Sequence, residues 1–296
     1  RIEELIGEAE MKKTKVEINS DNFPEEIRDL LKDATVYDSS CHSSAKVYYI
    51  DSGYYVKIDD LYTLKSEAEL SKLFYERGLG VEVVYYISSD KDYLVTHSAI
   101  GEDFTHYLQD PVKLCELLAT SLHKLHDQSI ENVPVSSRYQ RYMDSANGDY
   151  DGGYYDESVL LNRYMVHSKE EAWEIMQANK DKLVADTLIH GDACLPNIIQ
   201  EKGRFTSFID FNMAGVGDKH IDIYWAIKSL QINLKTEDYT DLFLDMPQST
   251  QNLYFHLGMR ADDDGFVGSP KKIQRMVGCS EDDFKVLISK QFIIPF

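Results

Sequence analysis

One polar loop and the short apolar segments around it constrain the fold of this chain more than any other feature. The loop runs from His190 to Asn197 and follows the apolar segment 187–189. The segments 198–200 and 205–209 then flank a turn at 201–204. Short apolar runs on either side of a glycine-containing turn predict a β-hairpin. We therefore expect a buried strand that leads into the loop and two paired strands that follow it.

This hairpin would bring two oxygen-bearing side chains together. With the turn centred between Lys202 and Gly203, Asn197 lies opposite Phe208, and Asp210 is its diagonal neighbour on the same face, about 7–8 Å away. Magnesium prefers a few carboxylate or amide oxygens and completes its shell with phosphate and water. Asn197 and Asp210 are therefore candidate Mg2+ ligands. The alternative is that the motif arises by chance and that both side chains lie on a solvated hairpin.

Asp192 lies in the same loop, before Asn197. Kinase catalytic loops combine an aspartate that faces the acceptor hydroxyl, an asparagine that helps to hold magnesium and a second, metal-binding aspartate downstream. Asp192 is therefore the candidate catalytic residue, and the pattern predicts phosphoryl transfer.

The charge of the chain limits its partners. Its 296 residues, enough for two lobes with their own cores, include 51 acidic and 31 basic residues and give a formal charge of −20. Nucleic-acid binding requires basic patches, so we expect no nucleic-acid partner. An anionic surface favours a cationic ligand, although acidity can equally serve solubility alone.

The remaining composition predicts a cytoplasmic protein, with a monomer as the simplest state. No run of about 18 apolar residues and no basic-then-apolar leader occurs, so neither a membrane span nor a signal peptide is expected. The four cysteines have no CxxC spacing and are expected to be reduced thiols. Met11 is a plausible natural start, which would make residues 1–10 upstream or added sequence.

The first hundred residues are rich in predicted strands. Residues 45–50 and 54–58 alternate around a turn that contains Gly53, and residues 81–87 and 93–96 indicate two further strands. The small polar residues 39–44 form a loop between strands. Their backbone N–H groups and hydroxyls could cover nucleotide phosphates, although serine-rich turns are usually only turns.

A helix is predicted over residues 64–77, ending at Gly78. Lys57, on the preceding strand, could reach nucleotide phosphates, and Glu67 on this helix could pair with it as in protein kinases. The alternative is that both are ordinary surface residues. Residues 97–101 are where a linker between lobes and an adenine-binding hinge would fall.

The second half of the chain has a helical pattern. A helix begins at Asp110-Pro111 and buries one leucine face, and the histidines 123 and 126 on it are more simply explained as packed residues than as a metal pair. Glycines at 148, 152 and 153 predict a loop. Ser168 and Glu171 fit a capping box for a helix to about Lys182. The acidic residues of 144–171 could line a site for a cationic substrate or form a solvated face.

Together these motifs resemble those of the aminoglycoside phosphotransferases, most closely the 3′-phosphotransferase branch. The resemblance covers about residues 36–246 and implies a two-lobed, protein-kinase-like α+β fold. The N-terminal nucleotide-binding lobe, 1–97, would contain a five-stranded antiparallel sheet, and residues 98–266 would form a mainly helical catalytic and substrate-binding lobe. Residues 267–296 remain a tail of unknown role. The matching motifs are His190-Gly191-Asp192-x4-Asn197, Phe208-Ile209-Asp210, Gly215-Val216-Gly217-Asp218, Asp222-Ile223 and the segment from Leu122 to His126.

The resemblance implies a role for each matched residue. Asp192 would act as catalytic base or orient the hydroxyl, Asn197 and Asp210 would bind Mg2+, Lys57 would contact the phosphates of ATP or GTP, and Glu67 would hold Lys57. Asp218 and Asp222 would be structural supports. Further nucleotide contacts are expected from Ser43, Ser44, Thr96, Ser98 and Ala99, and substrate contacts from Asp156, Glu157, Asp262, Asp263 and Asp264.

The expected function is transfer of the γ-phosphoryl group to a hydroxyl of a cationic aminoglycoside, with the 3′ hydroxyl as the expected acceptor, which would confer resistance. One departure is that many relatives have Asp-x-Gly-Arg where this chain has Asp210-Phe211-Asn212-Met213, so an arginine is missing. One alternative is a kinase of choline, homoserine or a thiosugar, for which Tyr150, Tyr154 and Tyr155 could form an aromatic cage. The other is a non-catalytic nucleotide-binding regulator.

Overall fold

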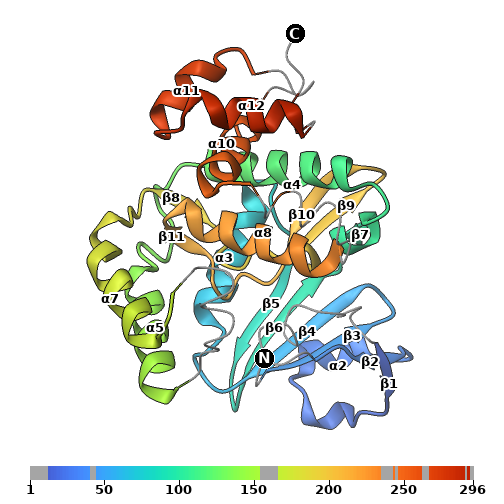
Figure 1. The fold of residues 1–296 in the computed structure, drawn as a ribbon. Helices are drawn as coiled ribbons and strands as arrows, with labels where there is room; N and C mark the ends of the chain where they lie inside the picture. Colours follow the sequence, from blue (N-terminus) through green and yellow to red (C-terminus); the bar gives the residue numbers. More distant parts are fainter. Residues whose placement is uncertain are drawn as a thin grey trace.

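The computed structural model describes residues 13–40, 45–153, 166–234, 243, 246–261, 267–290 and 292–293. Strands gather at one end of the molecule and most helices at the other (Figure 1). The strands are β1 (Thr14–Val16), β2 (Val36–Asp38), β3 (Lys46–Ile50), β4 (Tyr54–Asp59), β5 (Val83–Ser88), β6 (Asp92–His97), β7 (Glu102–Asp103), β8 (Thr187–Ile189), β9 (Ile198–Glu201), β10 (Arg204–Phe208) and β11 (Gly215–Gly217). The α-helices are α2 (Glu25–Leu31), α3 (Lys65–Glu76), α4 (Pro111–His126), α5 (Tyr139–Gly152), α7 (Lys169–Asn179), α8 (Lys219–Leu234), α10 (Gln248–Gly258), α11 (Pro270–Met276) and α12 (Glu281–Ser289).

The N-terminal sheet is antiparallel and has the order β1-β2-β3-β4-β6-β5. It has six strands rather than the five expected, because the short edge strand β1 pairs with β2. The predicted hairpin of β3 and β4 is confirmed, and Gly53 closes its turn with a φ of +96° that favours glycine.

The two faces of this sheet have different roles. One face packs with α2 in an apolar core that includes Ile27, Ile50 and Val56. Because side chains alternate along a strand, Lys57 lies on the opposite face from Val56. That opposite face is covered in part by α3: Ala68 of this helix and Leu64, directly before it, pack against Leu94 of β6. The sheet therefore presents Lys57 toward α3, and the predicted helix at 64–77 is confirmed as α3.

A second, three-stranded sheet has the order β10-β9-β7. Lys202 and Gly203, with φ values of 53° and 75°, form the tight turn between β9 and β10. A bulge between Phe205 and Ser207 shifts the register, so Phe208 pairs with Ile198 and not with Asn197 as predicted. The extra residue of a bulge is not signalled by the alternating pattern, and this explains the error of one position.

The helical part is built around α4. Asp110 caps this helix by accepting a hydrogen bond from the backbone of Lys113 at 3.0 Å, and its predicted leucine face is buried. The faces of α4 and α8 pack around the β8–β11 pair and the β9–β10 hairpin in the largest apolar core (Figure 1). No helix in the described part of the chain combines the length and the apolar character needed to cross a membrane.

The predicted loop around Gly148 is wrong, because these residues belong to α5. Glycine inside a helix costs about 1 kcal/mol relative to alanine. Packing compensates: Met143 is buried, and Tyr150 stacks on Trp173 of α7 with ring centroids 4.6 Å apart. Gly153, with a φ of +71°, ends the helix.

Only half of the predicted capping box at α7 forms. Ser168 accepts from the backbone of Glu171 at 3.1 Å, as expected, but the Glu171 carboxylate accepts from the backbone of His167 at 2.7 Å. The α-helix ends at Asn179, and a 3-10 turn continues to Lys182.

The C-terminal segment, to which the sequence assigned no structure, forms helices. Helices α11 and α12 pack on α10 through Leu253, Leu257, Ile273 and Leu287 at the end of the molecule away from the six-stranded sheet (Figure 1). Buried Asp283 accepts from the hydroxyls of Ser249 and Thr250 and from Ser280, whose side chain completes a capping box at α12. The segment is therefore an integrated part of the fold.

Candidate active site

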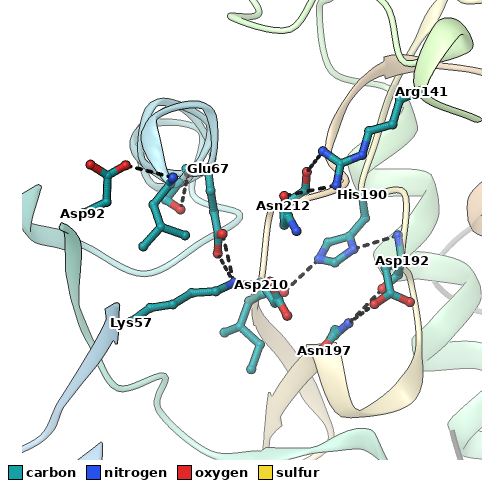
Figure 2. Close-up of polar contacts among 12 residues, drawn as sticks. Lys57, Glu67, Asp92, Arg141, His190, Asp192, Asn197, Asp210 and Asn212 are labelled. Atoms are coloured by element: carbon teal, nitrogen blue, oxygen red, sulfur yellow. Dashed lines mark hydrogen bonds and ion pairs between the residues drawn. The ribbon is translucent and has the colours of Figure 1, made fainter. Parts of the chain in front are cut away.

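The loop that contains Asp192 begins at a tight backbone turn after β8. Gly191 has a φ of +79°, and a Cβ there would overlap the carbonyl of Met213, so glycine is required at this position. His190 is fully buried; its Nδ1 accepts from the backbone of Asp192 at 3.3 Å, and its Nε2 lies 2.9 Å from the carbonyl of Ile209. His190 therefore connects the loop to Ile209, the residue directly before Asp210 (Figure 2).

Asp222, at the start of α8, holds the base of this loop. Its carboxylate accepts from the backbones of His190 and Gly191 at 2.9 and 2.6 Å and lies 2.9 Å from His126 Nε2. The side chain is completely buried. These contacts fit the structural support that the sequence predicted for Asp222, and they identify His126 as a packed, hydrogen-bonded residue.

Asp218 has a similar role beside β11. It accepts from the backbones of Val184 and His220, both at 2.9 Å, and lies 2.7 Å from His220 Nδ1. Burial opposes the charge of Asp218, but these hydrogen bonds lower its pKa below the ordinary value. Among the residues that the structure describes, no three His, Cys, Asp or Glu side chains gather as they do around a transition metal.

The carboxylate of Asp192 is held from both sides within its own loop. Asn197 Nδ2 donates to Asp192 Oδ2 at 3.1 Å and to its carbonyl at 3.0 Å (Figure 2). Cys194 Sγ lies 3.0 Å from Asp192 Oδ1. Because Asn197 uses its amide nitrogen in these bonds, its amide oxygen points the other way. The backbone of Ile209 donates to the Asn197 carbonyl at 3.0 Å, which places Asn197 beside the segment that leads to Asp210.

Asp210 lies in a left-handed backbone turn two residues after β10. Its φ of 62° lies in the left-handed region, which non-glycine residues adopt rarely and mostly where the surrounding structure requires it. This turn directs its carboxylate toward the N-terminal sheet, where Oδ1 lies 3.0 Å from Lys57 Nζ. The sequence predicted Asp210 as a metal ligand but not this ion pair.

Lys57 also pairs with Glu67, as predicted. Lys57 Nζ is 2.8 and 2.9 Å from the two carboxylate oxygens of Glu67, which is buried on α3 (Figure 2). Burial would lower the pKa of Lys57, but Asp210 and Glu67 raise it above the ordinary lysine value. Burial raises the pKa of the Glu67 carboxyl, Lys57 opposes that shift, and Asp210 adds to it. For Asp210, burial is likewise unfavourable to the charge, and Lys57 keeps its pKa below the usual range.

The charges in this cluster are not balanced. Two carboxylates, Glu67 and Asp210, share the single ammonium group of Lys57. The side chain of Asp210 is half exposed, whereas that of Glu67 is buried. A cation could therefore approach Asp210 from solvent, and Asn197, whose amide oxygen is not used in the bonds to Asp192, lies on the neighbouring loop. One carboxylate and one amide oxygen, with room for phosphate and water, fit the ligand preferences of Mg2+.

Sequence reasoning missed several residues that position this cluster. Leu64 precedes α3 without a side-chain cap of its own, and buried Asp92 supplies the acceptor instead, at 3.0 Å from the backbone of Leu64. Asp92 also accepts from Tyr86 and Ser88 at 3.0 and 2.6 Å. Residues so far apart in sequence leave no local capping signal.

Arginines from the α5 region support the segment after Asp210. Buried Arg138 donates to the carbonyls of Ala214 and Asn212 at 2.6 and 3.0 Å. Arg141 makes longer contacts of 3.4 Å with Asn212 (Figure 2). Burial and the nearby Arg141 lower the pKa of Arg138 to about 10. The segment from Asp210 to Met213 lacks the arginine of many relatives, but Arg138 and Arg141 contact it from the α5 region.

The predicted nucleotide-contact residues fall into two groups. Thr96 lies opposite Tyr55 of β4. Tyr55 and Lys57 are two residues apart on that strand, so Thr96, Tyr55 and Lys57 face the same side of the sheet. The backbone of Ser98, just after β6, donates to Gly53 at 2.9 Å, and Ala99 follows it. The remaining predicted residues lie outside the described part of the chain: Ser43, Ser44, Asp156, Glu157, Asp262, Asp263 and Asp264.

The aromatic cage considered for choline is not supported at Tyr150. This side chain stacks on Trp173, and Lys169 Nζ lies 4.9 Å from its ring centroid. Tyr154 and Tyr155 lie outside the described residues.

Comparisons with known proteins agree with this geometry. The model of the phosphotransferase enzyme family matches residues 41–245. A probable aminoglycoside 3′-phosphotransferase from Lactococcus lactis is 39% identical over 235 residues, covering 77% of this chain and 88% of the relative. An aminoglycoside 3′-phosphotransferase from Niallia circulans is 27% identical over 237 residues, covering 76% and 90%.

Solved structures show the same fold. An aminoglycoside phosphotransferase from Streptomyces rimosus has a TM-score of 0.55 at 15% identity, covering 86% of this chain and 90% of that one. Its structure in complex with ADP and streptomycin has the same TM-score at 13% identity, covering 83% and 89%. The predicted protein-kinase-like fold is therefore confirmed.

Proposed function

We propose that this chain, which belongs to the aminoglycoside phosphotransferase family, transfers the γ-phosphoryl group of a nucleoside triphosphate to a hydroxyl of an aminoglycoside. The 3′ hydroxyl is the proposed acceptor, because the relatives from Lactococcus lactis and Niallia circulans are named for that position. Such a reaction would inactivate the drug and confer resistance.

One observation supports this proposal above the others. Lys57 of the N-terminal sheet joins Glu67 of α3 to Asp210 of the hairpin, while Asp192 and Asn197 lie on the adjoining loop. Kinases require a lysine–glutamate pair for the phosphates, a metal-binding aspartate and a catalytic-loop aspartate with its asparagine. A non-catalytic regulator would not need Asp192, whose carboxylate is oriented by two donors from its own loop.

In the proposed mechanism, the protein mainly positions the acceptor hydroxyl and neutralises charge on the phosphates. Asp192 would orient the acceptor hydroxyl and receive its proton, while Lys57 would move from Asp210 toward the phosphates. Asn197 and Asp210 would hold Mg2+, which when bound neutralises charge on the phosphates. Phosphoryl transfer proceeds through a loose transition state, so in-line alignment and charge stabilisation provide most of the catalysis.

The nucleotide would lie against the face of the sheet that bears Lys57. Tyr55 is on that face beside Tyr49, with ring centroids 5.1 Å apart, and could stack on a purine base. Thr96, Ser98 and Ala99 would form the hinge side of the site, and residues 98–101 would link the two lobes. Ser43 and Ser44 would cover the phosphates. The proposed nucleotide is ATP or GTP.

The acceptor is proposed to be a polycation, in keeping with the net charge of −20. Carboxylates from Asp156, Glu157 and the 262–264 segment would bind its ammonium groups. Each charge-assisted hydrogen bond of this kind contributes about 1.5–3 kcal/mol.

The test is a panel assay of nucleoside diphosphate release. The protein is incubated with Mg2+, ATP or GTP, and one acceptor at a time: kanamycin, neomycin, choline, homoserine or a thiosugar. We expect kanamycin or neomycin to stimulate release and Asp192→Asn to remove that stimulation. Release stimulated only by choline, homoserine or a thiosugar would overturn the substrate assignment, and no stimulation by any acceptor would overturn the kinase assignment.

A further inference from the structure

We propose that Cys194 is a positioning residue for Asp192. Its thiol donates a hydrogen bond to Asp192 Oδ1 and fixes the carboxylate in the orientation that meets the acceptor hydroxyl. This inference rests on the proposed function, in which Asp192 contacts that hydroxyl.

The geometry assigns one donor to each oxygen of the carboxylate. Cys194 Sγ lies 3.0 Å from Oδ1, and Asn197 Nδ2 lies 3.1 Å from Oδ2. A carboxylate has several lone-pair positions, so one donor at each oxygen leaves both oxygens able to accept another. With both donors in place, rotation of the carboxylate about its bond to Cβ breaks at least one hydrogen bond. The remaining lone pairs are therefore held in fixed directions.

The thiol must carry its proton for this contact to be favourable. A thiolate and a carboxylate at 3.0 Å would repel each other, so S–H donation is the arrangement that the distance supports. Cys194 is only 7% exposed, so little water can compete for its thiol proton.

The surrounding loop keeps Cys194 in place. Its backbone N–H donates to the Asp192 carbonyl at 2.8 Å, and its own carbonyl accepts from Asn197 at 2.9 Å. The next residue, Leu195, is fully buried and donates from its backbone to Ser229 Oγ of α8 at 2.9 Å. The thiol therefore projects from a backbone that is tied to both Asp192 and the helical core.

The competing explanation is that Cys194 serves only as a small apolar residue in the core, a common role for buried cysteine. The two explanations differ in what a substitution should do. If packing alone matters, alanine should replace cysteine with little effect on turnover once the protein is folded. If the hydrogen bond matters, serine should preserve turnover, because it keeps a donor at the same position, and alanine should not.

A thiol also suits this position better than a stronger donor. It is a weak hydrogen-bond donor, so it can orient Asp192 while withdrawing little of the negative charge that must attract the hydroxyl proton. A serine hydroxyl would orient the carboxylate similarly but stabilise its charge more. We therefore expect serine to be somewhat slower than cysteine and much faster than alanine.

The experiment compares wild type, Cys194→Ala and Cys194→Ser, with Cys115→Ala as the matched control. Cys115 is a partly buried free cysteine on α4. For each protein, kcat, the KM values for kanamycin and for nucleotide, and the melting temperature are measured. We expect Cys194→Ala to lower kcat about tenfold with both KM values within about twofold, a smaller loss than the roughly 10²-fold that a 1 Å misplacement can cause. Cys194→Ser should stay within about threefold of wild type, and Cys115→Ala should match it.

Three results would overturn the inference while leaving the proposed function intact: a Cys194→Ala enzyme with wild-type kcat, a Cys194→Ser enzyme as slow as Cys194→Ala, or a loss confined to KM or to melting temperature. If the wild-type protein phosphorylates no aminoglycoside, the proposed function fails and this inference fails with it.

Discussion

Two acidic centres support the candidate active site, and they differ in how their negative charge is compensated. Asp222 is surrounded by donors that carry no fixed charge of their own: two backbone N–H groups and His126. Glu67 and Asp210 instead compete for one ammonium group, that of Lys57. The first centre is locally satisfied and holds the loop. The second has an excess of negative charge and is prepared for a cation.

This difference predicts that substitutions in one centre mainly reduce stability and that substitutions in the other mainly reduce activity. A buried acid whose hydrogen bonds are all provided should be costly to remove, because its partners lose their acceptor. Removing an acid from a cluster with excess negative charge should cost the fold less stability, although catalysis depends on that acid. Substitutions in the two centres therefore test the comparison directly.

The largest effect is expected for Asp210→Asn. This change should lower kcat by about 10³-fold or more, because it weakens the site for Mg2+, the ion that would neutralise charge on the phosphates. The melting temperature should fall only slightly, because the ion pair of half-exposed Asp210 with Lys57 is lost while its repulsion of Glu67 is relieved. Steady-state kinetics and thermal unfolding of the same preparation measure both. A stability loss as large as the loss of activity would break the proposed distinction.

Asp222→Ala should have the opposite profile, with a large loss of stability. It leaves the N–H groups of His190 and Gly191 and the ring of His126 without their acceptor, which we expect to cost about 3 kcal/mol or more of unfolding free energy. Urea denaturation measures this value. Lys91→Ala is the surface control, because its ion pair with Asp60 is exposed and 3.8 Å long, and it should change stability by less than about 0.5 kcal/mol. Equal values for the two variants would contradict the structural role of Asp222.

Arg138→Met should have an intermediate effect, because it removes the donor that holds the segment after Asp210. The carbonyls of Ala214 and Asn212 lose their partner inside the protein, at a cost of about 2 kcal/mol. Arg138→Lys restores one donor and should recover part of that loss. Unfolding free energies of the two variants rank them. A methionine variant as stable as wild type would show that water replaces the guanidinium.

An effect similar in size to that of Arg138→Met, but dependent on pH, is expected at Asp283 in the C-terminal helices. Despite burial, hydrogen bonds from Thr250, Ser249 and Ser280 lower the pKa of Asp283 to about 2. Since the unfolded value is about 3.9, the stabilisation is present above about pH 4 and is lost as pH falls toward 2. Asp283→Asn should therefore be less stable than wild type by about 2 kcal/mol near neutral pH, and the difference should shrink below about pH 4. Denaturation at several pH values checks this, and a pH-independent difference would contradict it.

The sequence predicted the parts of this molecule whose signals are local. The β3–β4 hairpin, the leucine face of α4 and the pairing of Lys57 with Glu67 follow from alternation, helical spacing and a strand–helix order. The contact between Lys57 and Asp210 did not follow, because it joins two segments far apart in the chain and depends on the left-handed turn at Asp210.

The remaining errors have the same physical origin. Helix α5 forms despite its glycines because Tyr150 stacks on Trp173, a contact that no local pattern contains. The register of β10 depends on a bulge near Thr206, and the cap of α3 comes from Asp92 on another element. Helices α11 and α12 are stabilised by packing of their apolar residues on α10, a contact that the local sequence does not show.

The most direct test of the account is to identify the product. Kanamycin is incubated with Mg2+, the nucleotide and either wild type or Asp192→Asn, and the drug is then examined by mass spectrometry and phosphorus NMR. If the proposed function is right, wild type adds one phosphoryl group to a hydroxyl of the drug, at the 3′ position, and the variant forms almost none. Nucleoside diphosphate release without phosphorylated drug, or equal product from both proteins, would contradict it.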